Sequence, residues 1–136
     1  IEAINTYQDH VHVSVFSAIQ EAAIVALESP RDLRDDLALL YETRRNRLIN
    51  GLRRAGWEIE APKGSFFVWA KVPEGDAKSF STKLLHEAGV AVTPGYFFGT
   101  EGEHHIRFGL VSSEQKIDEA VERIERLFAA YEEVHL

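Results

Sequence analysis

The apolar residues of this sequence change their spacing along the chain from helical to alternating and back, and this order limits the fold class. Four segments have helical spacing: 18–28, 30–55, 77–88 and 113 onward. Four shorter segments are rich in β-branched and aromatic residues: 57–61, 65–72, 90–93 and 106–110. The order helix, helix, strand, strand, helix, strand, strand, helix predicts an α+β fold, with helices packed on one face of a small, mostly antiparallel sheet.

Polar caps and glycines set the expected ends of the helices. Ser17 with Gln20, and Ser112 with Gln115, each have the spacing of a capping box. Asp76 is expected to cap the third helix. Glycine stops are expected directly after two helices, at Gly56 and Gly89. The opening stretch, 1–15, has no sustained period, and we interpret it as an interrupted segment.

Composition narrows the possible partners. With 136 residues, 45% of them hydrophobic, the chain can bury one core and carry an appendage. A formal net charge of −7 disfavours binding to nucleic acid or to an anionic membrane surface. No apolar run approaches the roughly 18 residues that span a bilayer. The lack of cysteine excludes disulfides and thiolate metal sites, and it is compatible with a cytoplasmic protein.

Arg107 is the first candidate for a functional side chain. The alternation of apolar residues over 106–110 points Arg107 away from the core, beside Gly109. There its planar guanidinium could bind a carboxylate through two parallel hydrogen bonds. An ordinary exposed strand arginine would show the same pattern, so both interpretations stay open at this point.

Two glycine-containing turns carry aromatic residues on flexible backbone, as the mouth of a substrate site requires. The first contains Gly64 and Ser65 and leads into two phenylalanines, and the second contains Gly95 and Tyr96. Ordinary turns with hydrophobic anchors have the same pattern. Neither turn has the spacing of a phosphate-binding loop.

The histidines and the arginine-rich stretch of the second helix have simple explanations. His10 and His12 project to one side of an extended segment, and His104 and His105 are adjacent. A metal site needs three or four convergent ligands, so no metal is expected. The arginines predict a solvated helix face balanced by nearby acids, with phosphate binding as the alternative. The arginines are Arg44, Arg45, Arg47, Arg53 and Arg54, and the acids are Asp32, Asp35, Asp36 and Glu42.

The second glycine-containing turn and the residues that follow it resemble a known family. The sequence VTPGYFFG over 92–99 is followed by Gly102 and by IRFG over 106–109. With the terminal helix after it, this unit resembles the C-terminal domain of class I/II (fold-type I) aminotransferases. PKGSFF over 62–67 resembles the family's turn into the strand beneath the substrate entrance, and AIQEAA over 18–23 resembles the end of its large domain. The likeness covers essentially the whole chain, and residues 7–10 with the helix at 16–26 resemble diaminopimelate-type members most.

The resemblance implies a parent protein that uses pyridoxal 5'-phosphate to transfer an amino group between an amino acid and a 2-oxo acid. It places Arg107 at the arginine that binds the substrate α-carboxylate, and Gly64, Ser65, Gly95 and Tyr96 at the substrate edge. It assigns residues 1–29 to the tail of the large cofactor-binding domain and 30–136 to the small C-terminal domain. It also implies a cytoplasmic homodimer.

The family's Schiff-base lysine is expected elsewhere. Its usual setting, a Ser-x-x-Lys-like run followed by Gly-x-Arg, does not occur here, and none of the five lysines fits the role. The sequence has no methionine and begins at Ile1, so we expect a fragment without the large domain. We therefore assign no catalytic or cofactor-binding residue and expect the fragment alone to be inactive.

Two other functions compete with this one. A free-standing regulatory α+β module that binds an amino acid without catalysis would use Arg107 in the same way. It should have a closed surface, whereas a severed domain should expose the apolar, alanine-rich face of the helix at 16–27. A third possibility, pairing of two copies through that face, leaves the pattern around Arg107 unexplained.

Overall fold

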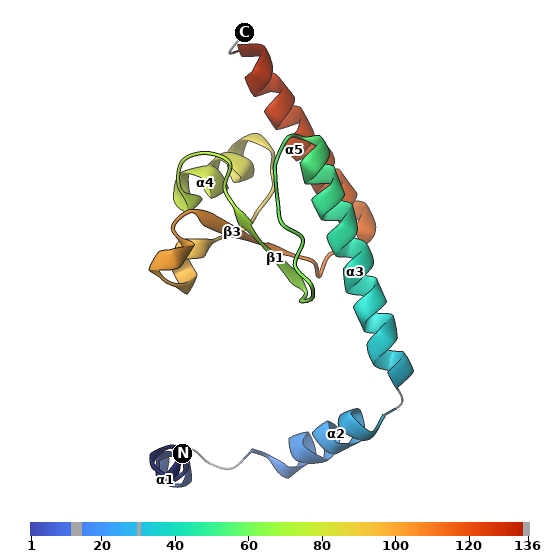
Figure 1. Cartoon of the computed structure of the whole chain (residues 1–136), viewed down its shortest axis with the longest axis vertical. Helices are drawn as coiled ribbons and strands as arrows, with labels where there is room; N and C mark the ends of the chain where they lie inside the picture. Colours follow the sequence, from blue (N-terminus) through green and yellow to red (C-terminus); the bar gives the residue numbers. More distant parts are fainter. Residues whose placement is uncertain (12–14, 30, 135–136) are drawn as a thin grey trace. The chain divides into compact units, whose positions relative to one another are not determined.

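The chain divides into two compact units, Ile1–Asp35 and Asp36–Leu136. The structure is a computed structural model, and it describes residues 1–11, 15–29 and 31–134 (Figure 1). His12, one of the histidines considered above, lies outside the described residues, and so does Pro30, the expected first residue of the second helix. No helix in the described ranges combines the length and the apolar character needed to cross a membrane.

The first unit contains two helices, α1 (Glu2–Val11) and α2 (Ser17–Glu28), and the start of α3. The interpretation of 1–15 as an interrupted segment missed α1. Ile4, Tyr7 and Val11 have the i, i+3, i+7 spacing of a helix, a pattern that is short and was overlooked among the polar residues. The predicted capping box at Ser17 was wrong, because Phe16 is the N-cap and Ser17 is already helical. Gln20 instead donates a hydrogen bond from Nε2 to the Val15 carbonyl oxygen at 2.6 Å.

The second unit is built around a three-stranded antiparallel sheet of order β1-β3-β2. Its strands are β1 (Phe67–Lys71), β2 (Thr93–Pro94) and β3 (His105–Gly109). The strand predicted at 90–93 is reduced to the two residues of β2, and the strand predicted at 57–61 does not form. Trp57 and Ile59 are buried as the pattern indicated. Their polar groups bond outside a strand ladder: Arg53 donates to the Ile59 carbonyl oxygen, and the Trp57 side chain donates from Nε1 to the carbonyl oxygen of Lys71 in β1.

Three helices complete this unit: α3 (Arg31–Arg54), α4 (Ala77–Glu87) and α5 (Glu114–Val134). The predicted glycine stops are confirmed, with positive φ at Gly56 and Gly89. The predicted cap of α4 is confirmed too, because Asp76 accepts hydrogen bonds from the first-turn amides. The capping box at Ser112 was wrong by one residue: Ser113 precedes α5, and its Oγ accepts from Lys116 N at 3.4 Å.

The predicted α+β architecture is confirmed. The strands bury one face, which carries Val68, Ala70, Ile106 and Phe108, and residues of α3, α4 and α5 join them in one hydrophobic core. Helices α3 and α5 lie side by side (Figure 1), and a Cβ on Gly51 would overlap the side chain of Val121. The predicted apolar face of α5 is therefore a packing surface.

The arginines of α3 do more than form a solvated face. Among the described ion pairs, Arg45 alone joins one of the expected acids, Glu42, at 3.0 Å. The others connect α3 to distant segments through ion pairs or through backbone carbonyl oxygens. The partners are the carbonyl of Leu110 for Arg44, Glu114 and Asp118 for Arg47, the carbonyl of Ile59 for Arg53, and Glu125 for Arg54. The helix is thereby fixed against the backbone at Ile59 and Leu110 and against α5.

Candidate carboxylate-binding site

Arg107 lies at the centre of the sheet face that the core leaves uncovered. In the register of the sheet, it pairs with Trp69 of β1 on one side and with Thr93 of β2 on the other. Alternation along the strands places Phe67, Trp69, His105 and Arg107 on this face, here called the open face. The predicted orientation of Arg107 away from the core is therefore confirmed.

The Arg107 guanidinium lies between two aromatic rings. Its Cζ atom is 5.3 Å from the ring centroid of Phe67 and 5.0 Å from that of Phe98. Its Nε atom is buried and has no hydrogen-bond partner, and no ion pair to Arg107 occurs among the described residues. A cation that is partly desolvated by rings and lacks an internal anion is suited to bind an external one.

The loop that carries Phe98 is fixed by the close approach of two glycines. It consists of the 3-10 helices η1 (Gly95–Phe98) and η2 (Thr100–Gly102). A Cβ on Gly95 would meet the carbonyl oxygens of Gly102 and His105, and a Cβ on Gly102 would meet the backbone of Gly95. The glycines of the predicted loop motif are thus required by backbone packing against β3.

The turn at Gly64 and Ser65 leads directly to the other ring. Both residues are exposed. Among the described residues, Ser65 is the one non-glycine residue with positive φ, at 91°. Such a conformation costs about 1–3 kcal/mol and persists only where the surroundings hold it. Two residues later, Phe67 begins β1 and contacts Arg107.

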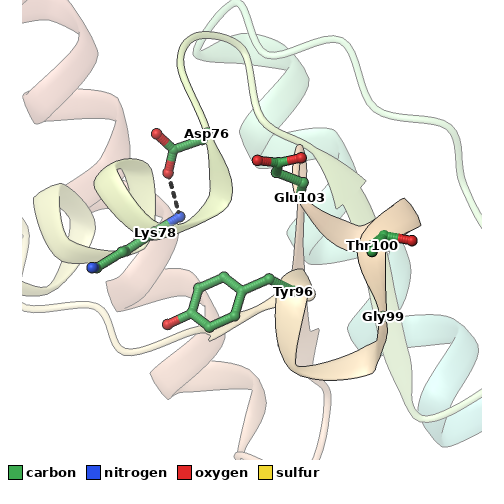
Figure 2. A pocket seen from close by; sticks show the side chains of 6 residues that line it. All are labelled: Asp76, Lys78, Tyr96, Gly99, Thr100 and Glu103. Atoms are coloured by element: carbon green, nitrogen blue, oxygen red, sulfur yellow. Dashed lines mark hydrogen bonds between the residues drawn. The ribbon is translucent and has the colours of Figure 1, made fainter.

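Tyr96 occupies a different pocket. Figure 2 shows its side chain extending from η1 toward Lys78 at the start of α4. The pocket, of about 570 Å³, is open and is lined also by Asp76, Gly99, Thr100 and Glu103. Hydrogen bonds from the Ser79 backbone and side chain, with one from the Lys78 backbone, hold the pKa of Asp76 below its usual 3.8. The substrate role of Tyr96 stays a prediction, and the ring of this loop that contacts Arg107 is Phe98.

Sequence reasoning missed most of the immediate neighbours of Arg107. Phe67 and Trp69 lie on the same face as Arg107 because β1 pairs with β3. The alternating pattern of the two strands would have predicted this, had their pairing been predicted. Trp69 stacks on His105 with ring centroids 5.5 Å apart and contacts Phe98 edge-on at 5.7 Å. The position of Phe98 depends on the Gly95–Gly102 contact, which no local pattern reveals.

Comparison with known proteins identifies the family. The model of the family "Aminotransferase class I and II" matches residues 1–124 of this chain. The chain belongs to this aminotransferase family. It is 48% identical over 128 residues to the L-glutamine--4-(methylsulfanyl)-2-oxobutanoate aminotransferase of Bacillus subtilis, covering 93% of this chain and 32% of that protein. It is 40% identical over 125 residues to the LL-diaminopimelate aminotransferase of Halothermothrix orenii, covering 91% and 32%.

Solved structures of aminotransferases agree with the fold. An aminotransferase from Staphylococcus aureus superposes with a TM-score of 0.82 at 33% identity, covering 94% of this chain and 34% of that one. The apo structure of BacF from Bacillus subtilis gives a TM-score of 0.78 at 38% identity, covering 93% and 33%. The chain thus spans about a third of the length of the aminotransferases that it matches.

The five lysines of this aminotransferase chain differ in their exposure. Lys83 is the least exposed, but its Nζ is 2.6 Å from Glu74 Oε1 and 3.5 Å from the ring centroid of Tyr131. Burial alone lowers the pKa of Lys83, yet the hydrogen bonds and charges of Glu74 and Tyr131 outweigh burial and raise this pKa above 10.5. The remaining lysines are exposed: Lys63, Lys71, Lys78 and Lys116.

Proposed function

We propose that residues 30–136 are the small domain of an aminotransferase that transfers an amino group between an amino acid and a 2-oxo acid, and that Arg107 binds the substrate α-carboxylate. One observation carries the proposal: the Arg107 guanidinium lies between Phe67 and Phe98 with a buried, unpartnered Nε. A carboxylate would supply the missing charge and accept two parallel hydrogen bonds. The rings would hold the guanidinium plane in one direction before the substrate arrives.

The chemistry of the reaction assigns Arg107 a positioning task. Pyridoxal phosphate, when bound, supplies the electron sink for breaking a bond at the substrate α-carbon. A bidentate carboxylate fixes the direction of that carbon, and correct geometry lowers the barrier by several kcal/mol.

We further propose that the Schiff-base lysine and the cofactor-phosphate contacts belong to residues outside 1–136, and that residues 1–29 are the tail of the large domain. The missing Ser-x-x-Lys-like setting supports the first part, and so does the ion pair of Lys83 with Glu74. The family match supports the second, because residues 1–29 lie inside the matched range 1–124. The chain alone is then expected to be inactive.

The finer assignments follow the family. The relatives differ in the substrates that their names give, which supports the general class of amino-acid and 2-oxo-acid substrates. We propose a diaminopimelate-type member on the strength of several LL-diaminopimelate aminotransferases among the relatives. A homodimeric, cytoplasmic enzyme is proposed by analogy with the family, with Gly64, Ser65, Gly95 and Tyr96 near the substrate entrance.

The test replaces Arg107 in the enzyme that carries this chain, loaded with cofactor. Arg107→Gln removes the charge, and Arg107→Lys keeps it without the planar fork. Charge-assisted hydrogen bonds contribute about 1.5–3 kcal/mol, so Arg107→Gln should raise the KM for the amino acid roughly 10- to 100-fold, with Arg107→Lys between it and the wild type.

The matched control is Arg54→Gln, because Arg54 is 67% exposed and pairs with Glu125 across α3 and α5. It should leave KM unchanged. An Arg107→Gln enzyme with the wild-type KM for amino acids, and the wild-type Kd for 2-oxo acids, would rule out the carboxylate role.

A further inference from the structure

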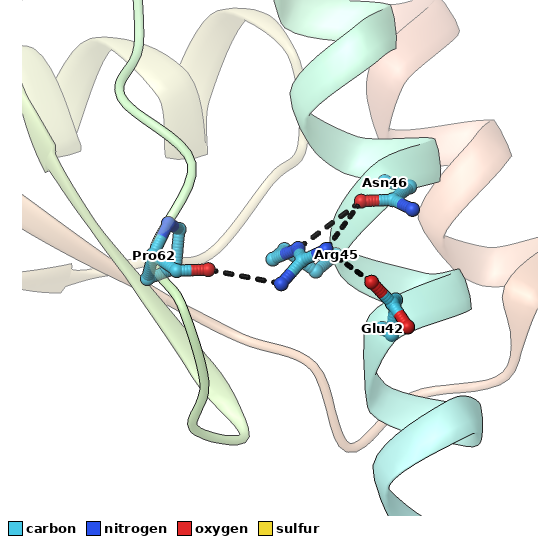
Figure 3. A network of polar contacts seen from close by, with 4 residues as sticks. All are labelled: Glu42, Arg45, Asn46 and Pro62. Atoms are coloured by element: carbon cyan, nitrogen blue, oxygen red, sulfur yellow. Dashed lines mark hydrogen bonds and ion pairs between the residues drawn. The ribbon is translucent and has the colours of Figure 1, made fainter.

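Arg45 of α3 connects the helix to the turn that precedes the Arg107 site. Figure 3 shows its guanidinium between Glu42 and Asn46 of the same helix and the carbonyl of Pro62 in the turn. Arg45 Nη1 donates to the Pro62 carbonyl oxygen at 3.0 Å. Nε and Nη2 donate to Asn46 Oδ1 at 3.1 and 2.9 Å, and Nη2 donates to Glu42 Oε1 at 3.0 Å. With its side chain only 15% exposed, Arg45 is held in one orientation.

The hydrogen bond to Pro62 fixes one end of a strained turn. Ser65, three residues after Pro62, has a φ of 91°. At the other end, the Phe66 carbonyl oxygen accepts from Leu110 N at 2.8 Å. A strained residue keeps its conformation only while the backbone on both sides is held. The Arg45 hydrogen bond therefore helps to restrain the conformation of Ser65.

The turn passes this restraint to the Arg107 site through aromatic contacts. The ring of Phe66 contacts Tyr41 of α3 at 6.3 Å and packs edge-on against Phe67 at 5.6 Å. The ring of Phe67 in turn lies 5.3 Å from Arg107 Cζ. The path from Arg45 to the guanidinium of Arg107 thus runs along the backbone of residues 62–66 and then through the rings of Phe66 and Phe67.

We propose that Arg45 is a positioning residue for carboxylate binding: by holding the Pro62 carbonyl it keeps the turn closed, and the turn keeps Phe67 against the Arg107 guanidinium. Without the Arg45 hydrogen bonds, Ser65 relaxes toward negative φ and the ring of Phe67 moves. Arg107 then samples several directions and binds a carboxylate through one hydrogen bond in place of two. The inference rests on the proposed function and adds a residue that does not touch the substrate.

A spectroscopic test on the full 136-residue chain follows Arg107 directly. Ring currents from Phe67 and Phe98 should shift the NMR signal of the Arg107 Nε–Hε group. The variant Phe67→Leu gives the chemical shift of this group when the Phe67 ring is absent. Arg45→Ala should move this signal most of the way to the Phe67→Leu position. Arg45→Lys, which can donate to Pro62 but cannot also bond Asn46 and Glu42 in the same geometry, should move it part of the way. The control Arg54→Gln should not move it.

A kinetic test in the cofactor-loaded enzyme separates positioning from general damage. Arg45→Ala should raise the KM for the amino acid about tenfold with kcat within about twofold, because the lost contact affects ground and transition states alike. If Arg45→Ala does not fold, Arg45→Lys takes its place with a smaller effect of the same kind.

The outcomes distinguish the two proposals. If Arg45→Ala or Arg45→Lys leaves both the Arg107 signal and KM at wild-type values while Arg107→Gln raises KM, the role of Arg45 is overturned and the proposed function stands. A wild-type KM in Arg107→Gln overturns the proposed function itself. A shifted Arg107 signal together with a raised KM in the Arg45 variants supports both.

Discussion

Gly95→Ala should unfold the loop that holds Phe98 against Arg107, and its cost can be worked out from the backbone around it. The new Cβ would overlap the carbonyl oxygens of Gly102 and His105 and lie 2.8 Å from Cη2 of Trp69. Two of these neighbours are backbone atoms of η2 and β3, so no rotamer change can make room. The loop must move away from the sheet.

The magnitude follows from two opposing effects. Overpacking of this kind costs about 3 kcal/mol when the neighbours cannot move. Alanine recovers about 0.5–1 kcal/mol, because glycine loses more conformational freedom on folding and φ at Gly95 is not positive. The net loss is about 2–2.5 kcal/mol, which corresponds to a Tm lower by roughly 10 °C for a unit of about a hundred residues. Since Phe98 belongs to η1, Arg107 should lose this ring at the same time.

Urea denaturation followed by circular dichroism measures the free energy of unfolding, and Gly64→Ala is the matched control. Gly64 lies in the other glycine-containing turn, where a new Cβ would have no heavy atom within 4 Å beyond its chain neighbours and φ is not positive. Its replacement should leave the stability unchanged or raise it by up to about 1 kcal/mol. If Gly95→Ala is as stable as Gly64→Ala, the close glycine contact does not hold the loop and the reasoning is wrong.

Two further changes test the turn and the helix cap. Ser65→Gly should raise the free energy of unfolding by about 1 kcal/mol, because glycine adopts a φ of 91° without strain. Urea denaturation measures this free energy, and a lower value than in the wild type would contradict the argument. Asp76 has a pKa held below 3.8, so its contribution to stability is fully present above pH 3.8 and is lost as the pH falls through the lower, folded-state pKa. Amide hydrogen exchange at the start of α4 should increase in that acid range, and Asp76→Asn should abolish this pH dependence; an equal dependence in both proteins would contradict the assignment.

The parts of the fold that could be predicted from the sequence are those with a strong local signal. The apolar face of α5, the alternation in β3 and the cap at Asp76 all depend on residues close in sequence. The same alternation oriented Arg107 correctly, since the side chains of a strand point to its two faces in turn.

The errors arose where distant partners decide the structure. Residues 57–61 have strand-like composition, but in the described sheet β1 pairs with β3 and this segment joins neither strand. Its backbone bonds to the Arg53 side chain instead. At α5, adjacent serines offered two caps, and the local pattern could not choose Ser113 over Ser112. The arginines of α3 could be identified as polar, but their carbonyl partners lie in segments that only folding brings close.

The two rings beside Arg107 are held in different ways, and this difference predicts which side of the site can adapt. Phe98 sits on a loop fixed by backbone overlap at Gly95 and Gly102, where any side chain is excluded. Phe67 follows a strained turn held by hydrogen bonds, among them the one from Arg45. Closely packed backbone atoms cannot move past one another by small steps, whereas hydrogen bonds can break and reform at a modest free-energy cost. Movement at the carboxylate site should therefore come from the Phe67 side, with the Phe98 side as its fixed wall.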